Sequence, residues 1–591
     1  MLNPKNNRID YGSILSPPNN YELDFAIGTT YSLDLDALVG ASISLGLSAE
    51  SDSDLNENPI FLLEALRSTG DKVALFCESG QIKYPNKTTP LYILLEEMVF
   101  QVTNENNVKH SKYASFHPKV WLIRYASDKD EILYRIIVLS RNLTFDRSWD
   151  LTFTMDGRKA SKSSSKNNPL IKFIEYLTKY STDDDKTDKI RRIMDELPFV
   201  EFELNQPFEG FEFIVNGIDD DFVIQNQQLF TSNSLDKLLI MTPFLSKDVI
   251  EDFNSRKNPK SQATLITRMQ SLDKDLNLDN FEVYALKDEI VEGESLLSGE
   301  TENFAKQDIH AKMYVVEKTK YTDLYLGSLN ASHNALYGNV EFMIKLGARK
   351  RKFNINKVLK EVFNGEADGP DNPFQQIDLN ELQQEETDGN NLNLVVKDIV
   401  RLSANAKIVE NGNKFDIELE FENGCDKYDI TVNPLLSNKT SEFSRRMVFK
   451  ELDKTQLSEF FVITVTKDDE TVRRVIKIPV DNLPEDREKE VVSNVIKDKT
   501  AFIRYVAFLL GDEYIISSVD DWEGKDSKDK YGGFTIQLPE LYEKMLKAAM
   551  YEPEKFREIE FLIKMLSNDE NVVPEGFDEL YNTFKRVIDD E

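Results

Sequence analysis

Apolar positions in the first 350 residues follow two alternating patterns. Residues 23–31 and 72–77 are short, mostly apolar runs of strand length, whereas residues 58–68 and 91–100 have apolar side chains at helical spacing. The order of strand, helix and strand returns at residues 235–268. Strands that alternate with helices predict an α/β fold in which the strands are buried.

The pattern changes in the last third of the chain. Residues 365–391 are acidic and rich in Gln and Asn, which predicts a linker. Runs with partial apolar–polar alternation lie within residues 392–481 and predict a small antiparallel β-sandwich. Helical periodicity returns within residues 482–591, where the aromatic positions are those of a core.

Two short blocks in the α/β part carry matching polar residues. His117 and Lys119 have counterparts in His310 and Lys312, each 193 residues further along the chain. Side chains two residues apart on a strand share a face, so each His should lie beside its Lys. Each block is followed by a Ser-x-Asn turn and then by an acid: Ser140, Asn142 and Asp150 after the first, and Ser328, Asn330 and Glu341 after the second. The repeat predicts an internal duplication of about 190 residues.

These side-chain types together suit a phosphate diester. The Lys ammonium supplies the counter-charge, and the amide donates hydrogen bonds to phosphate oxygens. A neutral imidazole can attack phosphorus or transfer a proton.

At these residues the chain resembles the phospholipase D superfamily, whose members carry two H-x-K-x4-D blocks followed by Gly-Ser or Ser-x-Asn turns. The second block fits, with Glu317 in the place of the acid. The first block departs from the pattern, because Arg124 takes the place of the acid and Leu139 precedes Ser140 where the second block has Gly327. The tyrosyl-DNA phosphodiesterase branch also lacks the acid, so the resemblance favours a nuclease over a lipase.

The resemblance implies an α/β architecture of two pseudo-two-fold related, phospholipase D-like lobes, followed by a small antiparallel β-sandwich and a C-terminal helical domain. The predicted boundaries are 1–199 for the first lobe, 200–364 for the second lobe, 365–391 for the acidic linker, 392–481 for the sandwich-like domain and 482–591 for the helical domain.

The resemblance also implies a mechanism. One His attacks phosphorus to form a phosphohistidine while the other protonates the leaving oxygen, and His117 is expected to be the nucleophile. The residues predicted to be catalytic are His117, Lys119, Asn142, His310, Lys312 and Asn330. Residues predicted to support them from behind are Ser140, Asp150, Glu317, Ser328 and Glu341. Nearby basic residues predicted to contact the substrate weakly are Arg141, Arg147 and Arg268.

Composition narrows the functional classes. The net charge is −32, from 72 basic and 104 acidic residues, which argues against a general nucleic-acid coat, so a polyanionic substrate must meet a local basic cleft. Two cysteines exclude a disulfide framework, and no apolar run is long enough to span a membrane, so a cytoplasmic location is predicted. No Cys/His cluster has metal-ligand spacing, and no cofactor is expected.

The leading prediction is a metal-independent phosphodiesterase, a nuclease acting on nucleic acid, with DNA favoured over RNA. By resemblance, it would serve in bacterial phage defence or restriction beside a helicase or ATPase partner. The alternative is a non-catalytic scaffold that partners a helicase or ATPase, which Arg124 and the long C-terminal part favour. A phospholipase is disfavoured by the acidity of the chain and by the lack of a membrane anchor.

Overall fold

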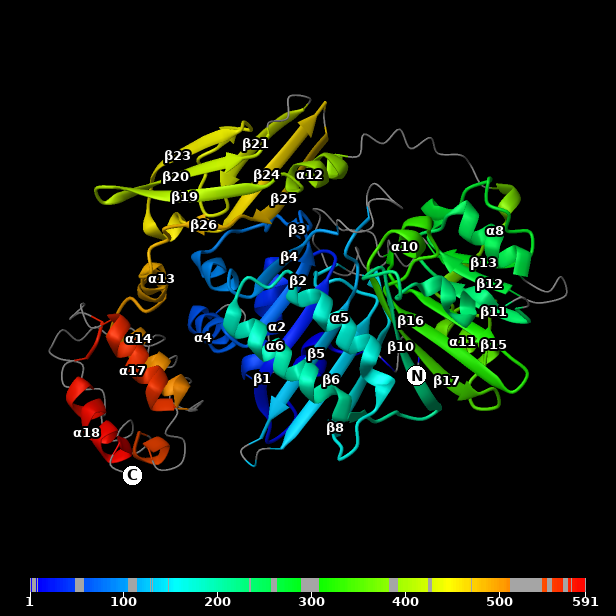
Figure 1. The fold of residues 1–591 in the computed structure, drawn as a ribbon, viewed down its shortest axis with the longest axis horizontal. Coiled ribbons are helices and arrows are strands. Elements are labelled where there is room, and N and C mark those ends of the chain that lie inside the picture. The colour runs from blue at the N-terminus through cyan, green and yellow to red at the C-terminus, as the bar shows by residue number, and fades with distance from the viewer. Residues whose placement is uncertain are drawn as a thin grey trace.

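The computed structural model describes residues 2, 7, 9–47, 58–104, 114–127, 129, 131–146, 148–232, 235–256, 263–287, 308–381, 392–423, 428–468, 470–510, 545–549, 555–566, 572–574 and 577–589. Over these ranges the fold is mixed α/β (Figure 1). Two large sheets lie side by side, a sandwich of smaller sheets lies over the first of them, and the last helices pack at the far side of the first sheet.

The first large sheet is formed early in the chain. Its strands, within the described ranges, run in the order β4 (Val99–Val102), β2 (Val73–Glu78), β1 (Glu22–Thr30), β5 (Val120–Ala126), β6 (Ile132–Leu139), β8 (Thr152–Lys159) and β9 (Val200–Phe202). The central strand β1 pairs parallel with β2 and antiparallel with β5. All six residues of β2 are buried, as the apolar run predicts for a strand covered on both faces.

The second large sheet has a corresponding order. Its strands are β10 (Phe208–Asn216), β17 (Glu341–Arg349), β16 (Tyr321–Gly327), β15 (Met313–Glu317), β11 (Lys237–Met241), β12 (Ala263–Thr267), β13 (Phe281–Leu286) and β18 (Phe374–Gln376). Its central strand β11 pairs parallel with β12 and antiparallel with β15, as β1 does with β2 and β5. The strand that follows each H-x-K block therefore holds the same position in its own sheet.

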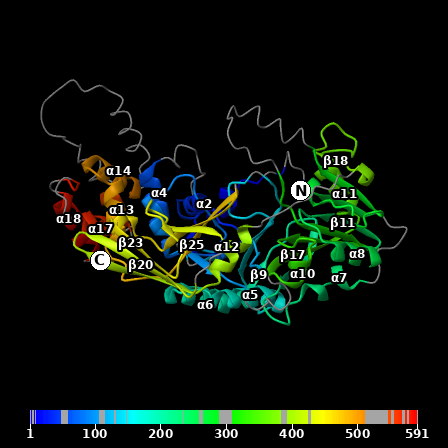
Figure 2. The ribbon, with the colours of Figure 1, turned by 90° about the horizontal axis from the view of Figure 1, so that it is seen from above.

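Helices cover both faces of each large sheet. On the first sheet, α2 (Leu35–Leu47) and α4 (Pro59–Gly70) cover one face and α5 (Asn168–Thr178) and α6 (Asp184–Glu196) cover the other (Figures 1 and 2). On the second sheet, α8 (Lys247–Arg256) and α10 (His333–Tyr337) share one core, and α11 (Ile355–Val362) lies on the opposite face.

One hydrophobic core joins the two large sheets. It contains Phe173 of α5 and Phe342 of β17, whose ring centroids lie 5.1 Å apart. Phe213 of β10 belongs to the same core. Because close-packed interiors resist small displacements, this shared core fixes how the two large sheets sit against each other. We call the line where they meet the seam.

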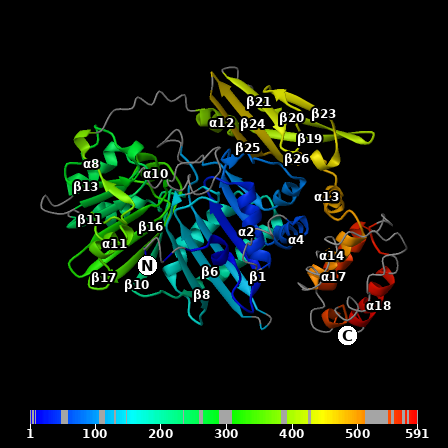
Figure 3. The ribbon, with the colours of Figure 1, turned by 180° about the vertical axis from the view of Figure 1, so that it is seen from behind.

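The sandwich begins with α12 (Leu392–Val400). One of its sheets, among the described strands, is formed by β23 (Arg446–Leu452), β20 (Lys414–Phe421), β19 (Ala404–Asn411) and β26 (Val480–Asp481). The other is formed by β22 (Ser441–Glu442), β21 (Asp429–Pro434), β24 (Phe460–Lys467), β25 (Glu470–Lys477) and β3 (Ile82–Lys83). Burial alternates along β20, as one covered face requires. Strand β3 comes from the first lobe, and Figure 3 shows the sandwich above that lobe from behind.

The C-terminal helices pack on the first lobe through α4. They are α13 (Arg487–Val495), α14 (Lys499–Leu509), α17 (Lys555–Leu566) and α18 (Phe577–Asp589). Arg67 of α4 donates to the Tyr505 hydroxyl of α14 at 2.6 Å, and that hydroxyl donates to the Glu64 carboxylate. Among the helices that the structure describes, each falls short of the length and apolar character needed to cross a bilayer.

Local structure differs from the sequence predictions in two segments. The helix predicted over 91–100 is a short 3-10 helix, η1 (Pro90–Leu95), followed by β4, because Val99 to Val102 pair parallel with the open edge of β2. The acidic linker predicted over 365–391 contains β18, which adds to the edge of β13. In both cases residues predicted to form a helix or a linker pair instead with the open edge of a strand, which offers unpaired N–H and carbonyl groups.

Candidate active site

The two H-x-K blocks occupy equivalent positions at the starts of β5 and β15. The Lys119 ammonium donates to the His117 carbonyl at 2.9 Å, and the Lys312 ammonium donates to the His310 carbonyl at 2.5 Å. Each bond holds a buried ammonium beside its own His and leaves two further N–H groups to offer an anion.

Each block is tied to the opposite lobe by main-chain hydrogen bonds. The His117 N–H donates to the Val340 carbonyl at 2.9 Å, and the His310 N–H donates to the Trp149 carbonyl at 2.9 Å. Val340 and Trp149 are the residues immediately before Glu341 and Asp150. The crossing therefore brings both blocks and both acids to one seam.

The acids and the serines form matched pairs. Ser140 Oγ donates to Asp150 Oδ1 at 3.3 Å, and Ser328 Oγ donates to Glu341 Oε2. Each serine oxygen also accepts the N–H of the residue after the acid, at 2.8 Å from Leu151 and 3.0 Å from Phe342. The two serines thus fix the carboxylates in equivalent orientations.

The carboxylates meet the imidazoles differently. Glu341 Oε2 lies 3.0 Å from His117 Nδ1, and Glu341 Oε1 accepts the Asn339 amide at 3.0 Å. With Nδ1–H donating to this carboxylate, the Nε2 lone pair of His117 is free to face a substrate. Asp150 accepts the hydroxyls of Ser140 and Ser148 and acts on His310 through its charge.

The two predicted amides follow the strands that pair with the blocks. Thr242 Oγ1 donates to Asn330 Oδ1 at 3.4 Å and accepts the Ala331 N–H at 3.2 Å. In the first lobe, Thr30 Oγ1 accepts the Leu143 N–H at 2.9 Å in the corresponding bond. Among the described residues, the buried Asn142 Oδ1 has no hydrogen-bond partner.

Burial sets the protonation of the site. It lowers the pKa of His117 to about 4, an effect that Glu341 opposes and Lys119 reinforces. Burial also lowers the pKa of His310 to about 4, with a further decrease from Lys312 and an opposing effect from Asp150. Both imidazoles are therefore neutral at pH 7, which leaves each a lone pair for attack or proton transfer.

The two ammonium groups are also destabilised by burial. Burial lowers the pKa of Lys312 to about 8, and burial followed by repulsion from Lys312 holds the pKa of Lys119 well below its usual value. A phosphate anion bound beside them would oppose both shifts, so these two ammonium groups favour an anionic ligand.

Several residues around His117 were not predicted as site residues. The Tyr31 ring lies 5.1 Å from the imidazole. Glu78 accepts the Phe116 N–H at 2.7 Å and pairs with Lys397 at 3.5 Å. Lys397 belongs to α12 of the sandwich, nearly 280 residues along the chain from His117, so no local motif could have indicated it. Asn339, two residues before Glu341, could have been found from its position.

Glu317 differs from its predicted role behind the site. It accepts the Ile355 N–H at 2.8 Å and pairs with Lys350 at 2.7 Å, so it holds the start of α11 at the far end of β15. Arg124, at the same place in the first block, pairs with Glu196 of α6 at 3.1 Å and with Asp24 at 2.9 Å. The position of the motif acid is five residues after the Lys, or roughly 16 Å along an extended chain. The side chain at this position therefore acts on a helix.

The three weakly predicted basic residues have different surroundings. Arg268 lies within electrostatic reach of His310 and Lys312, and its guanidinium lies 4.9 Å above the Phe244 ring. Arg141 donates to the carbonyls of Thr144 and Asp146 at 2.7 and 2.9 Å, which holds the loop after β6. Arg147 lies outside the described residues.

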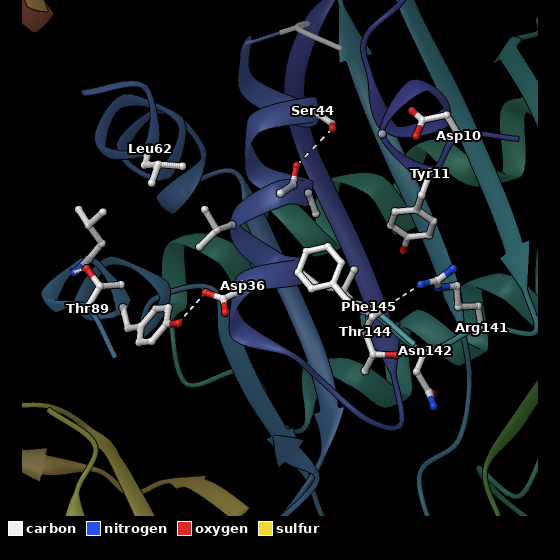
Figure 4. A pocket seen from close by; sticks show the side chains of 18 of the residues that line it. Asp10, Tyr11, Asp36, Ser44, Leu62, Thr89, Arg141, Asn142, Thr144 and Phe145 are labelled. Atoms are coloured by element: carbon white, nitrogen blue, oxygen red, sulfur yellow. Dashed lines mark hydrogen bonds between the residues drawn. The ribbon is translucent and has the colours of Figure 1, made fainter. Parts of the chain in front are cut away.

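A hollow of about 550 Å³ opens beside this loop (Figure 4). Arg141, Asn142 and Phe145 line it from the loop, Tyr11 lines it near Arg141, and Asp36 of α2 lines it from the opposite side. Across the part of the chain that the structure describes, no group of three or more His, Cys, Asp or Glu side chains is arranged to hold a metal ion.

Comparisons with known proteins give low similarity. No family model matches the chain, and no curated protein matches it in sequence. Similar solved structures include the yeast tyrosyl-DNA phosphodiesterase, with 13% identity over 57% of this chain and 85% of that chain and a TM-score of 0.34. The polyphosphate kinase of Porphyromonas gingivalis is 12% identical over 66% of this chain and 51% of its own, with a TM-score of 0.33. The phosphatidylserine synthase of Haemophilus influenzae Rd KW20 is 11% identical over 66% and 90%, with a TM-score of 0.34.

TM-scores this low do not carry a functional assignment. The function is therefore inferred from the geometry of the seam.

Proposed function

We propose that the chain is a metal-independent phosphodiesterase that acts on nucleic acid through a phosphohistidine on His117. The observation that carries this proposal is the crossing of the two blocks at one seam. In the proposal, the two imidazoles, which burial keeps neutral, and the two buried Lys side chains surround one phosphate.

The proposed reaction has two displacements. In the first, His117 Nε2 forms a bond to phosphorus, the bond from phosphorus to the leaving oxygen breaks, and protonated His310 gives its proton to that oxygen. In the second, neutral His310 takes a proton from water, the water oxygen attacks phosphorus, and the phosphorus–nitrogen bond breaks to restore His117.

The side chains around the imidazoles supply the remaining functions. Lys119 and Lys312 neutralise the charge that develops on the non-bridging oxygens, and the amides of Asn142 and Asn330 donate to the same oxygens. Glu341 stabilises the positive charge that His117 gains when it is phosphorylated. Binding of the anionic diester raises the pKa of His310, so that it carries the proton that it must donate.

The different surroundings of the imidazoles support the assignment of roles. His117 is oriented by a carboxylate and enclosed by Tyr31, which suits a nucleophile that must be held in line. His310 lies among charges of both signs, which suits a group that exchanges protons with water and a leaving oxygen.

The test is turnover of bis(p-nitrophenyl) phosphate and of end-labelled DNA oligonucleotides in excess EDTA. We expect undiminished cleavage, together with a phosphorylated His117 peptide after an alkaline quench and mass spectrometry. Cleavage that vanishes with EDTA and returns with magnesium would contradict the proposal. Hydrolysis of phosphatidylcholine vesicles without cleavage of nucleic acid would favour the phospholipase alternative.

The preference for DNA over RNA, a helicase or ATPase partner and a role in phage defence remain predictions from the resemblance. The geometry of the seam bears only on the chemistry of the diester.

A further inference from the structure

The sandwich and the first lobe share a strand, which places four residues of interest together. Lys83 of β3 pairs with Arg474 of β25, and Ile82 pairs with Val475, in an antiparallel ladder (Figure 1). The ladder sets Tyr84, the residue after β3, beside Arg473. A two-residue strand thus brings side chains of the first lobe and of the sandwich to one surface.

A hollow of about 570 Å³ lies at this junction and is lined by Lys83, Tyr84, Thr471, Arg473 and Arg474. We call it the β3 hollow, after the strand that carries Lys83. Three of its lining residues are cationic, in a chain whose net charge is −32. Such a local reversal of sign concentrates a positive potential that attracts polyanions.

An aromatic face lies within this positive potential. The Arg473 guanidinium lies 5.5 Å from the Tyr84 ring centroid, and Tyr84 is 38% exposed. Arg474 is held in place, since its guanidinium donates to Asn393 Oδ1 at 2.9 Å. An exposed ring with cations around it can stack a base while the cations meet the neighbouring phosphates.

Contacts link the lining of the β3 hollow to the candidate active site. Lys83 pairs with Asp146 at 2.7 Å, and Asp146 lies within electrostatic reach of His310. Arg474 lies within electrostatic reach of Tyr31, whose ring lies 5.1 Å from His117. A second pairing of a cation with an exposed ring, Arg268 above Phe244, also lies within electrostatic reach of His310.

We propose that the β3 hollow binds single-stranded nucleic acid and leads the strand to His310 and His117. An unpaired base stacks on Tyr84, and the flanking phosphates contact Arg473 and Lys83. This inference rests on the proposed function and makes the sandwich part of the substrate-binding surface. A single strand is required because a base inside a duplex is stacked on its neighbours and does not present its face to a side chain.

The test measures binding without turnover. Fluorescein-labelled oligo(dT) is titrated into the full-length His117→Ala protein and followed by anisotropy. Arg473→Glu and Tyr84→Ala should each weaken binding about tenfold, and Arg473→Glu should also reduce the salt dependence of log K by about one unit of slope. Tyr84→Phe keeps the ring and should bind within about twofold of the parent protein.

The matched controls are an exposed Arg and an exposed Tyr that lie on other strands. Arg446 is on β23 in the other sheet of the sandwich with its side chain 76% exposed, and Tyr321 is on β16 with 51% exposure. Arg446→Glu and Tyr321→Ala should leave binding of oligo(dT) within about twofold. Thermal melts check that every variant is folded.

Three outcomes would overturn the inference. The first is that Tyr84→Ala and Arg473→Glu bind oligo(dT) as tightly as the two controls. The second is that a duplex of matched length binds as tightly as the single strand and responds equally to Tyr84→Ala. The third is that Arg473→Glu weakens binding to phosphatidylglycerol vesicles while leaving oligo(dT) binding intact. Because anisotropy needs no turnover, these results are independent of the EDTA and phosphohistidine tests, and either proposal can fail alone.

Discussion

The two H-x-K blocks share their backbone hydrogen bonds and differ in what surrounds their imidazoles. Each His donates its N–H to the opposite lobe, and each Lys donates to its own His carbonyl. Yet the His117 imidazole contacts the Glu341 carboxylate, whereas His310 is surrounded by the charges of Lys312, Asp150 and Arg268. The same backbone arrangement can therefore hold two imidazoles in different surroundings.

The place of the motif acid makes the same point with opposite charges. Arg124 reaches Glu196 of α6, and Glu317 reaches the start of α11 and Lys350. Either sign can tie a helix to the end of a strand. The missing acid in the first block therefore leaves the site itself intact.

The largest effect is expected from the imidazoles. His117→Ala and His310→Ala should each lower kcat at least about 10³-fold, and the double variant should be little worse than either, because the two groups act as one unit. On a substrate with a good leaving group, only His310→Ala should accumulate a phosphohistidine, measured by mass spectrometry.

His333→Ala is the control for this comparison. Its imidazole is exposed, lies outside both H-x-K blocks and pairs with Asp248 at 2.6 Å. Full biological activity in the His117→Ala/His310→Ala double variant would instead support the scaffold alternative.

A smaller and unequal effect is expected from the two acids. Glu341→Gln should lower kcat about 100-fold, because it removes the carboxylate that contacts His117, and Asp150→Asn should lower it about tenfold. The readout that separates orientation from folding is the ¹⁵N shift pattern of His117, which should change its tautomer signature only in Glu341→Gln. Equal losses in both variants would mean that the imidazoles are held alike.

The helix ties should affect stability and spare turnover. Arg124→Met should lower the free energy of unfolding by about 2 kcal/mol, because it leaves the partly buried carboxylates of Glu196 and Asp24 without their guanidinium. Glu317→Gln should lower it by less than about 1 kcal/mol, because Gln can still accept the Ile355 N–H and Lys350 is exposed. The midpoint of urea unfolding measures the loss, and kcat on the folded fraction should stay within about twofold. A large loss of kcat in Glu317→Gln alone would return that residue to the site.

The smallest effect concerns pH. His117 titrates at roughly 6.5 in an unfolded chain, and burial lowers its pKa in the fold to about 4. As pH falls from 6.5 towards 4, the unfolded state therefore binds the proton first and the fold loses stability. His117→Gln lacks this proton, so its Tm should decline a few degrees less than that of the parent over this range. Parallel declines would show that His117 is not buried as a neutral imidazole.

Patterns along the chain were enough to predict elements that depend on sequence neighbours. The apolar runs after the two blocks predicted the strands β5 and β15. His117 and Lys119 lie just before β5, and the Lys119 ammonium donates to the His117 carbonyl, so a shared strand face for their side chains stays a prediction. The repeated order of Ser, Asn and acid likewise indicated which residues belong together. The alternation in β20 predicted a half-buried strand of the sandwich.

Only the tertiary structure decided which distant segments meet. Glu341 faces His117 because Val340 accepts the His117 N–H across the seam, and Lys397 reaches Glu78 because α12 lies over the end of the first sheet. Strands β3 and β18 exist because open sheet edges offer unpaired N–H and carbonyl groups to whichever segment lies beside them. Such pairings are set by burial and edge geometry between segments far apart in sequence, and the local pattern of hydrophobic and polar residues carries no record of them.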